Sequence, residues 1–328
     1  MLDTNFPLYA VAFLATFFIT VSVERILIPK LAMKAKQPIY EGGPKWHSAK
    51  SGTPTMGGLA FLLASSIALL LGSAFLFIDG RGESGLSLLI CLGYSIANAL
   101  IGIIDDRTKL KRKENAGLSP KQKLLAQSIL SALFLLAQAV ILKKGSTLAF
   151  SFGEIDLGAF YYILAMLILL GITNCANLTD GIDGLASSVG FSVGISLFYI
   201  SCALSYDTAF ISSAITGATA GFLVFNMHPA RIFMGDTGSL FLGALAASGA
   251  FALGNPLLIV FIGFVYVIEG ISVILQVIGF KLTGRRIFKM APIHHHLEQK
   301  GWEENKICLL AMIITFIFSI PAFIFYLP

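Results

Sequence analysis

The sequence predicts an all-α polytopic membrane protein with ten transmembrane helices, and two observations lead to this prediction. The first is composition, because 56% of the 328 residues are hydrophobic and only 12% are charged, with a mean hydropathy of +0.83. A soluble globular protein needs more polar side chains than this to cover its surface. The second is the recurrence of apolar stretches of about 20 residues, the length of helix that crosses about 30 Å of hydrocarbon.

These apolar stretches follow one another along the whole chain without a linker, so we expect a single membrane domain spanning residues 1–328. Their approximate extents are 6–28, 55–78, 86–104, 122–142, 157–175, 185–206, 208–226, 237–253, 255–280 and 306–327. The first is too long for the core of a signal peptide and has no basic flank before it, whereas Arg25 and Lys30 lie near its far end. We therefore expect it to remain as a span with its N-terminus outside.

Basic residues support this orientation. It places the segments near residues 29–54, 105–121, 176–184, 227–236 and 281–305 in the cytoplasm. Counted with the adjacent helix ends, these segments hold all of the 23 Lys and Arg residues except Arg81, Lys143 and Lys144. This asymmetry follows the positive-inside rule, and an even number of spans puts the C-terminus on the extracytoplasmic side too. The net charge of +5 is then a topology signal that predicts contact with membrane lipids and no nucleic acid.

Five aspartates lie where apolar runs meet the cytoplasmic segments: Asp105, Asp106, Asp180, Asp183 and Asp236. Carboxylates at the edge of the hydrocarbon are costly, and several together repel one another unless cations hold them. The cluster therefore predicts a cation site at the cytoplasmic face, with Mg²⁺ as the ion and phosphate as the group it handles.

Each aspartate motif also has a plainer explanation. Asp105 and Asp106 close the third span, where they could simply pair with neighbouring basic residues. Asp183 could cap the sixth span. Asp236 or Thr237 could cap the apolar run at 237–253, although a helix N-terminus there would also attract phosphate. We favour ligand binding, because a cap or a surface ion pair does not explain the complete polar strings.

Other polar residues accompany these aspartates. In NLTDGIDGLA, Asp180 and Asp183 would share a face if the segment is helical, with Gly181 allowing a ligand close to the backbone and Asn177 one turn earlier. Phe233 is a loop aromatic that can stack on a base.

Two further segments contribute candidates. KSGTPTMGG combines Lys50 with the hydroxyls of Thr53 and Thr55, and Glu269 and Gln276 interrupt the ninth span. Polar groups inside a span bridge helices or line a cavity, and Gln276 is the better ligand candidate because it lies nearer the cytoplasmic end.

A triple histidine, His294, His295 and His296, lies in the last cytoplasmic segment. Three consecutive residues of a regular helix cannot all face one ion, and zinc sites space their ligands. A hydrogen-bonding patch for phosphate or diphosphate is therefore favoured over a zinc site, and histidines without a chemical role are the plainer alternative.

Taken in order, the strings KSGTPTMGG, IDD followed by Lys121 and Lys123, NLTDGIDGLA, FNMHPARIFMGDTGS and PIHHHLEQKGWEE resemble the phospho-N-acetylmuramoyl-pentapeptide transferases. These belong to the polyprenyl-phosphate N-acetylhexosamine-1-phosphate transferases. The resemblance covers about residues 45–305. It implies ten membrane helices and transfer of phospho-N-acetylmuramoyl-pentapeptide from UDP-MurNAc-pentapeptide to undecaprenyl phosphate, which gives lipid I and UMP in peptidoglycan synthesis. It also implies Mg²⁺, a homodimer and the bacterial inner membrane.

The resemblance further implies site residues. Asp105, Asp106 and Asp236 match the catalytic aspartates, with Asp236 as the Mg²⁺ ligand, and Lys121 and the three histidines match other essential polar positions. The positions that match the uridine and diphosphate pocket are Lys50, Thr55, Asn177, Asp180, Gly181, Ile182, Asp183, Asn226, Phe233 and Gln276.

Two alternative functions are a sister transferase that moves N-acetylglucosamine-1-phosphate and, more remotely, a secondary transporter. The histidine string favours the muramoyl-pentapeptide enzyme over the sister transferase. A transporter predicts polar groups at mid-membrane and repeat symmetry, whereas these polar groups gather at one face.

Overall fold

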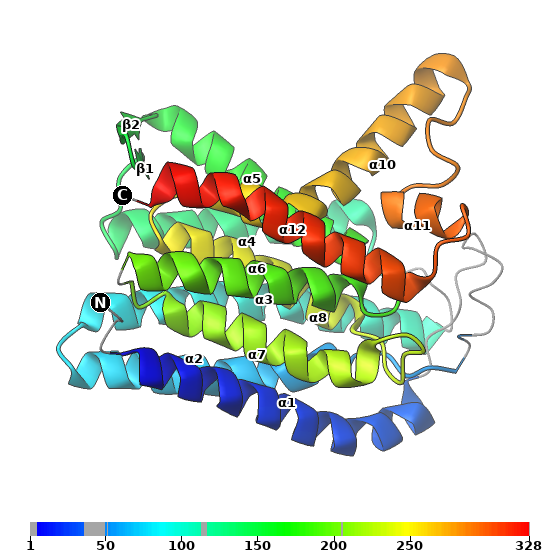
Figure 1. Ribbon diagram of the computed structural model, residues 1–328, viewed down its shortest axis with the longest axis horizontal. Coiled ribbons are helices and arrows are strands. Elements are labelled where there is room, and N and C mark those ends of the chain that lie inside the picture. The colour runs from blue at the N-terminus through cyan, green and yellow to red at the C-terminus, as the bar shows by residue number, and fades with distance from the viewer. Residues whose placement is uncertain (1–4, 36–49, 51, 113–116, 205, 328) are drawn as a thin grey trace.

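The fold is a bundle of long helices that run side by side, shown in Figure 1. A computed structural model describes residues 5–35, 50, 52–112, 117–204 and 206–327. In this part of the chain the elements are α1 (Phe6–Lys34), α2 (Gly58–Ile78), α3 (Gly82–Arg112), α4 (Pro120–Val140), β1 (Thr147–Phe150), β2 (Gly153–Asp156), α5 (Ala159–Thr179), α6 (Leu185–Ala203), α7 (Ala209–Asn226), α8 (Gly235–Ala252), α9 (Leu258–Ile262), α10 (Phe264–Thr283), α11 (Ile293–Glu298) and α12 (Glu304–Tyr326).

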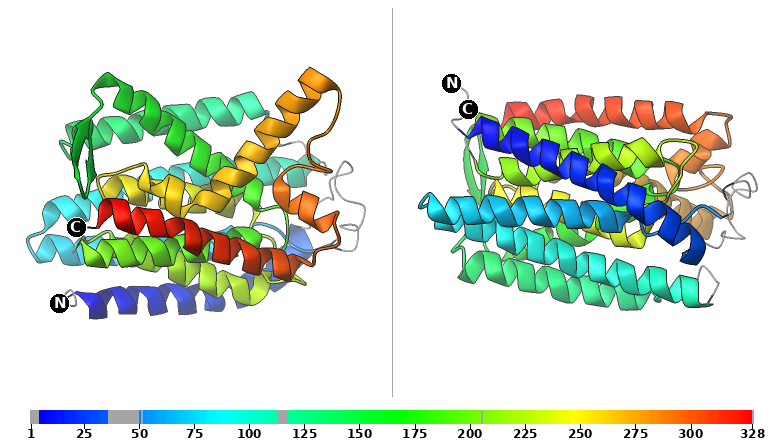
Figure 2. Two further views of the ribbon diagram at one scale, coloured as in Figure 1. Left: turned by 45° about the horizontal axis from the view of Figure 1, so that its top comes forward. Right: turned by 90° about the horizontal axis from the view of Figure 1, so that it is seen from below.

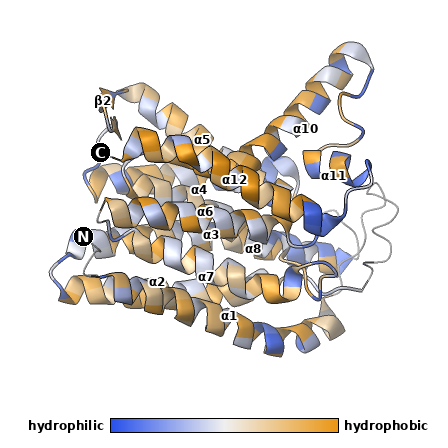
Figure 3. Ribbon diagram, in the orientation of Figure 1, coloured by the Kyte–Doolittle hydropathy of each residue, from blue (hydrophilic) through white to orange (hydrophobic). Residues whose placement is uncertain are grey.

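Nine helices of the described chain, α1 to α7, α10 and α12, are long and apolar enough to cross a membrane. The predicted class, an all-helical multi-pass membrane protein, is therefore confirmed. Figure 3 shows the helices as mostly hydrophobic, with hydrophilic residues gathered toward the ends of the bundle. The remaining predicted span, 237–253, forms α8, which is not among the nine because Gly, Ser and Ala residues and Asp236 lower its hydropathy.

Helix α8 is the centre of the bundle. Every residue from Thr237 to Phe251 is buried, and α8 packs on α3, α5 and α2, with further contacts to α6 and α7. Two glycines allow the closest approaches. A Cβ on Gly58 of α2 would lie 2.2 Å from the Cα of Gly238, and one on Gly102 of α3 would lie 2.3 Å from the carbonyl oxygen of Asp236. A helix shielded by protein on all sides does not need the apolar surface that lipid demands.

Two predicted spans differ from the observed helices. The third, predicted at 86–104, extends to Arg112, so Asp105 and Asp106 lie inside α3 and not at its end. Basic residues in the last turn of α3 suit the negative end of the helix dipole and allow the helix to continue.

The ninth span, predicted at 255–280, is broken into α9 and α10. Gly263 separates the two helices, and a Cβ there would lie 2.7 Å from the carbonyl oxygen of Ile259. Beyond the break, α10 diverges from the other helices, as the views in Figures 1 and 2 show.

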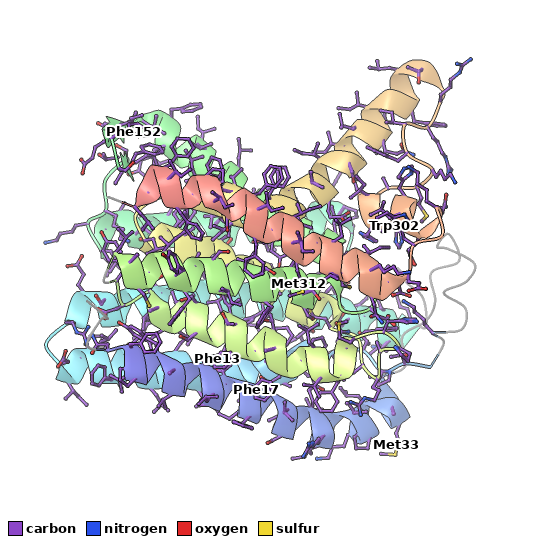
Figure 4. All side chains as sticks on the ribbon, viewed as in Figure 1. Phe13, Phe17, Met33, Phe152, Trp302 and Met312 are labelled. Carbon is purple, nitrogen blue, oxygen red and sulfur yellow. The ribbon has the colours of Figure 1, made fainter. Side chains whose placement is uncertain are left out.

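The two ends of the bundle differ in what they carry. The antiparallel hairpin of β1 and β2 lies at the same end as the start of α1 and the end of α12 (Figure 1), and the backbone N–H of Ser151 donates to the carbonyl of Phe325 at 2.7 Å. Figure 4 places Phe152 at this end and Trp302 at the other. Both termini therefore lie at one end of the molecule, as the even number of predicted spans requires; the side of the membrane that this end faces stays a prediction.

Candidate active site

Three carboxylates converge where α3 meets the first turn of α8. Asp105 and Asp106 come from α3 and Asp236 from α8, and one oxygen of each lies within 4.8 Å of the others. Asp105 and Asp106 are buried, and the glycine contact between Gly102 and the Asp236 backbone lets the two helices come this close. Three converging carboxylates form an all-oxygen donor set that suits a hard divalent cation such as Mg²⁺.

Two lysines pair with two of these carboxylates, Asp105 and Asp236. The Lys109 Nζ lies 2.7 Å from an oxygen of Asp105 and 3.3 Å from one of Asp236, and the Lys123 Nζ lies 3.1 Å from Asp105 and also pairs with Asp236. Burial opposes ionisation of Asp236, but the ammonium groups of Lys109 and Lys123 outweigh it and hold the pKa of this carboxyl below its usual range. The ion pair between Asp105 and Lys109 is the plainer explanation foreseen for this motif, and it coexists with the carboxylate cluster.

The lysine that reaches the cluster from α4 is Lys123, whereas Lys121 is the one expected from the resemblance. A capping box begins α4, in which the Ser119 N–H donates to Gln122 Oε1 at 2.9 Å and the Gln122 N–H donates to Ser119 Oγ at 3.3 Å. Residues two apart on a helix point to different sides, so Lys121 is exposed while Lys123 faces the aspartates. Lys109 is one of the neighbouring basic residues expected to pair with Asp105, and its place one turn later on α3 accounts for the contact.

Asp106 caps the N-terminus of α8 from outside that helix. Its carboxylate accepts from the backbone N–H of Asp236 at 3.1 Å, from the N–H of Thr237 at 2.9 Å and from the Thr237 hydroxyl at 2.7 Å. The expectation that Asp236 or Thr237 is itself the cap is wrong, because α8 begins at Gly235, after Met234. The capping carboxylate comes from α3 because the close packing of α3 and α8 brings it there, so the Asp236 side chain has no capping role and pairs with Lys109 and Lys123.

Asn177 and Asp180 extend the same cluster. Asn177, in the last turn of α5, donates to Asp236 Oδ1 at 3.1 Å and to the Ser239 hydroxyl at 2.8 Å. Residues 180–184 form a turn, so the expectation that Asp180 and Asp183 share a helix face is wrong. Burial, together with the nearby charges of Asp236, Asp106 and Asp183, raises the pKa of Asp180 well above its usual range.

Asp183 belongs to a second polar cluster that joins four segments. It pairs with Lys50 at 2.8 Å and with the His228 ring at 2.9 Å, and it accepts from the Ala230 N–H at 3.0 Å. Glu304 accepts from Lys50 at 2.6 Å and from the Asp183 N–H at 2.7 Å. Asp183 does not cap α6, whose N-cap is Gly184. His228 and Glu304 were not predicted, although they lie in the strings MHPAR and GWEE, which belong to the motifs that carry the resemblance.

The remaining pocket candidates contact the segments that carry these two clusters. Asn226 accepts from the Gly184 N–H at 3.1 Å and donates to the Ile232 carbonyl at 2.9 Å. Phe233 is half-buried, and its N–H donates to the Pro54 carbonyl at 2.8 Å. The Thr55 and Ile182 side chains are buried, and a Cβ added to Gly235 would lie 3.0 Å from the Thr55 hydroxyl.

The three histidines point to three different partners, as the helical argument expects. The His294 Nδ1 lies 3.1 Å from Glu269 Oε2, the His295 Nδ1 lies 2.6 Å from Glu298 Oε2, and the His296 Nδ1 accepts from the Lys289 N–H at 3.1 Å. Of the three rings, that of His294 is fully buried, and its Nε2 faces Gly181. The structure thus brings His294 to the turn that carries Asp180.

Gln276 is engaged away from the aspartates. Its side-chain oxygen accepts from the N–H groups of Ile287 and Phe288 at 3.1 and 2.9 Å, and its nitrogen donates to the Phe288 carbonyl at 3.0 Å. It therefore fastens the segment after α10 to that helix, and its predicted contact with a ligand stays a prediction.

Comparisons with known proteins give two family matches and relatives that cover nearly the whole chain. The glycosyl transferase family 4 pattern matches residues 88–254, and signature 1 of the phospho-N-acetylmuramoyl-pentapeptide-transferases matches residues 50–62. A phospho-N-acetylmuramoyl-pentapeptide-transferase from Clostridium perfringens (strain SM101 / Type A) is 43% identical over 97% of this chain and 96% of its own. The enzymes of that name from Shouchella clausii and Halalkalibacterium halodurans are 45% identical over 93% of both chains and 43% identical over 94% of both chains.

Proposed function

Because the chain belongs to the phospho-N-acetylmuramoyl-pentapeptide-transferase family, we infer that it transfers phospho-N-acetylmuramoyl-pentapeptide from UDP-MurNAc-pentapeptide to undecaprenyl phosphate, forming lipid I and UMP in peptidoglycan synthesis. The observation that carries this inference is the match of nearly the whole chain to these enzymes. The convergence of Asp105, Asp106 and Asp236 at one end of the bundle supports it, since phosphoryl transfer needs such a cation site.

We propose that Mg²⁺ binds at this carboxylate cluster, with Asp236 as the principal ligand and Asp105 and Asp106 beside it. The all-oxygen donor set supports the choice of Mg²⁺. When bound, the ion supplies positive charge that offsets the repulsion between the phosphates of the two substrates. Asp106 keeps the first turn of α8 in place through its three capping hydrogen bonds.

Lys109 and Lys123 would serve the phosphates directly. Both ammonium groups already lie against Asp236, so they are within reach of a diphosphate bound there. Fixed cations aimed at the charge that develops in a transition state are a major source of rate acceleration. We assign this role to Lys123 in preference to Lys121, whose side chain is exposed.

We propose direct attack by the lipid phosphate, with Asp105 as a positioning group. A phosphate monoester has a second pKa of about 6 and is mostly dianionic near neutrality, so it needs little help from a base. The Asp105 carboxylate is already engaged by the Leu118 N–H at 2.7 Å and by two lysines, which disfavours a role as covalent nucleophile. A covalent route would release one UMP per enzyme without undecaprenyl phosphate, whereas direct attack releases none.

We assign nucleotide binding to the residues around the two clusters. The Lys50 ammonium, the Asn177 and Asn226 amides and the ring of Phe233 provide the charge, hydrogen-bonding groups and stacking surface that a uridine diphosphate requires. The turn with Asp180, Gly181, Ile182 and Asp183 lies between them, and we propose that Thr55, His294, His295, His296 and Gln276 complete the region.

We also propose the finer membrane assignments that the charge distribution and the resemblance imply. They are ten spans in a single domain, both termini on the extracytoplasmic side of the bacterial inner membrane, and a homodimer. The buried α8 supports a tenth span, because α8 runs through the centre of a bundle of candidate spans.

The first experiment measures UMP release by the purified protein in detergent with undecaprenyl phosphate and Mg²⁺. It compares UDP-MurNAc-pentapeptide with UDP-N-acetylglucosamine, and Asp236→Asn with the control Asp156→Asn on the exposed hairpin. Release with the muramoyl substrate alone, lost in Asp236→Asn and kept in Asp156→Asn, is the expected result. Preference for the hexosamine substrate would move the chain to the sister transferases, and activity with neither would revive the transporter alternative.

A further inference from the structure

The ring of His294 is fixed from one side by a buried carboxylate. Glu269, on the second turn of α10, lies 3.1 Å from the His294 Nδ1 through its Oε2, and the same oxygen lies 3.4 Å from the backbone N–H of His294. Glu269 is 3% exposed and His294 is 1% exposed, so water does not compete for this contact. This oxygen accepts from the backbone N–H of His294, and the same acceptor role toward the ring corresponds to the tautomer with the proton on Nδ1.

The second ring nitrogen is directed at the nucleotide region. A Cβ added to Gly181 would lie 2.2 Å from the His294 Nε2, so this nitrogen is pressed against the turn that carries Asp180. Among the described residues Nε2 is buried and has no hydrogen-bond partner. A buried polar atom without a partner is costly, and a ligand group at this turn would satisfy it.

The divergent helix α10 supplies the geometry. Glu269 and Gln276 are seven residues apart on α10, which places them on one face, and Gln276 binds the backbone of Ile287 and Phe288. The segment that leads to the histidines is therefore fastened to α10 at two points. The break at Gly263 sets the direction in which α10 leaves the bundle and so the position of Glu269.

We propose that Glu269 is a positioning residue for phosphoryl transfer: it fixes the His294 proton on Nδ1 and aims the Nε2 lone pair at the turn of Asp180 and Gly181, where Nε2 accepts a hydrogen bond from a hydroxyl or N–H group of the nucleotide substrate. This inference rests on the proposed function. A neighbour that sets the tautomer and orientation of a histidine contributes through that ring and touches no substrate itself.

The test combines kinetics with a direct view of the ring. Glu269→Leu and Glu269→Gln are made alone and together with His294→Gln, and Ser272→Ala is the control, because Ser272 is buried one turn later on α10 and bonds only to the Glu269 carbonyl in the described chain. The measurements are kcat for UMP release, the unfolding temperature in detergent and the ¹⁵N shifts of the His294 ring, assigned by their loss in His294→Gln.

We expect Glu269→Leu to lower kcat about tenfold to a hundredfold, the loss associated with one charge-assisted hydrogen bond. Glu269→Gln keeps an acceptor oxygen and should retain more activity, while the unfolding temperature changes little in either variant. In the His294→Gln background the same substitutions should change kcat less than about twofold, because coupled residues are not additive. The ¹⁵N shifts should change from a ring protonated on Nδ1 to a mixture of tautomers in Glu269→Leu.

Equal losses in both backgrounds, or ring shifts that Glu269→Leu leaves unchanged, would overturn the proposal. The ring shifts decide the matter where His294→Gln is too slow to assay. If the wild-type protein releases no UMP from UDP-MurNAc-pentapeptide, the proposed function fails, while the ring shifts still show whether Glu269 sets the tautomer.

Discussion

The three aspartates of the carboxylate cluster, Asp105, Asp106 and Asp236, make different contacts. Asp105 and Asp236 pair with Lys109 and Lys123, whereas Asp106 caps α8. The pattern of aspartates at the ends of apolar runs was enough to find all three. It did not separate their roles, because adjacent residues of one helix point in different directions and their partners come from distant segments of the chain.

Replacement of Lys123 tests the assignment of the α4 lysine. We expect Lys123→Met to lower kcat for UMP release by about a hundredfold, since it removes a cation aimed at the phosphates. Lys111→Met, an exposed lysine at the end of α3, is the control and should stay within about twofold of the wild type. Lys121→Met is compared with them. A larger loss in Lys121→Met than in Lys123→Met would return the role to Lys121.

Asp180 should make stability depend on pH when no metal is present. Burial and the neighbouring carboxylates raise its pKa above the unfolded value of about 4. The folded state then binds this proton more tightly than the unfolded state. The contribution of Asp180 to the free energy of unfolding is therefore fully present below pH 4 and is lost as the pH rises through the folded pKa. We expect metal-free Asp180→Asn to unfold at a higher temperature than the wild type at pH 8, with the difference shrinking toward pH 5. A constant difference across this range would contradict the raised pKa.

At the scale of elements, hydropathy located the helices but not their exact limits or breaks. The third span was cut short because its last two turns are polar, yet these turns project beyond the apolar region and remain helical. The break between α9 and α10 was missed because Gly263 lies inside a continuous apolar run. Such a break depends on what packs around it, and a hydropathy pattern does not contain that information.

We expect the close helix crossings to affect activity as strongly as the charged residues do. Gly102→Ala would place a Cβ 2.3 Å from the Asp236 carbonyl oxygen, so α8 must shift, and we expect a loss of about 1–3 kcal/mol in stability together with most of the activity. Gly93→Ala, on the same helix, meets nothing within 4 Å and should be neutral or slightly stabilising. Unfolding temperature and UMP release measure both effects. Equal behaviour of the two variants would show that the crossing is not tightly packed.

At the scale of the whole molecule, the polar clusters of the candidate active site lie at one end of the bundle and the β1 and β2 hairpin lies at the other. The aspartates, the lysines and the histidine segment gather at the end opposite the β1 and β2 hairpin, as Figure 3 indicates by its hydrophilic residues. The sequence predicted this through the one-sided distribution of Lys and Arg, a signal that needs no knowledge of packing. The second cluster around Asp183 could not be predicted as a unit, because its four segments meet only in the folded chain.

Labelling of single added cysteines tests the orientation. Asp156→Cys, on the exposed hairpin, should react with a membrane-impermeant maleimide in intact spheroplasts, whereas Lys111→Cys should react only after permeabilisation. The unsubstituted chain is the background control, since its four cysteines are buried or partly buried. The reverse pattern of labelling would invert the topology.

The small-residue composition of α8 has a consequence for how the protein is made. If α8 crosses the membrane as proposed, its Gly, Ser and Ala residues and its acidic first turn leave it less apolar than the candidate spans, so it would enter the membrane beside helices that are already there. Seven candidate spans, α1 to α7, precede α8 in the chain and are synthesised before it. The helix that carries Asp236 is thus inserted into a nearly finished bundle, and the acidic centre cannot assemble on a half-made protein.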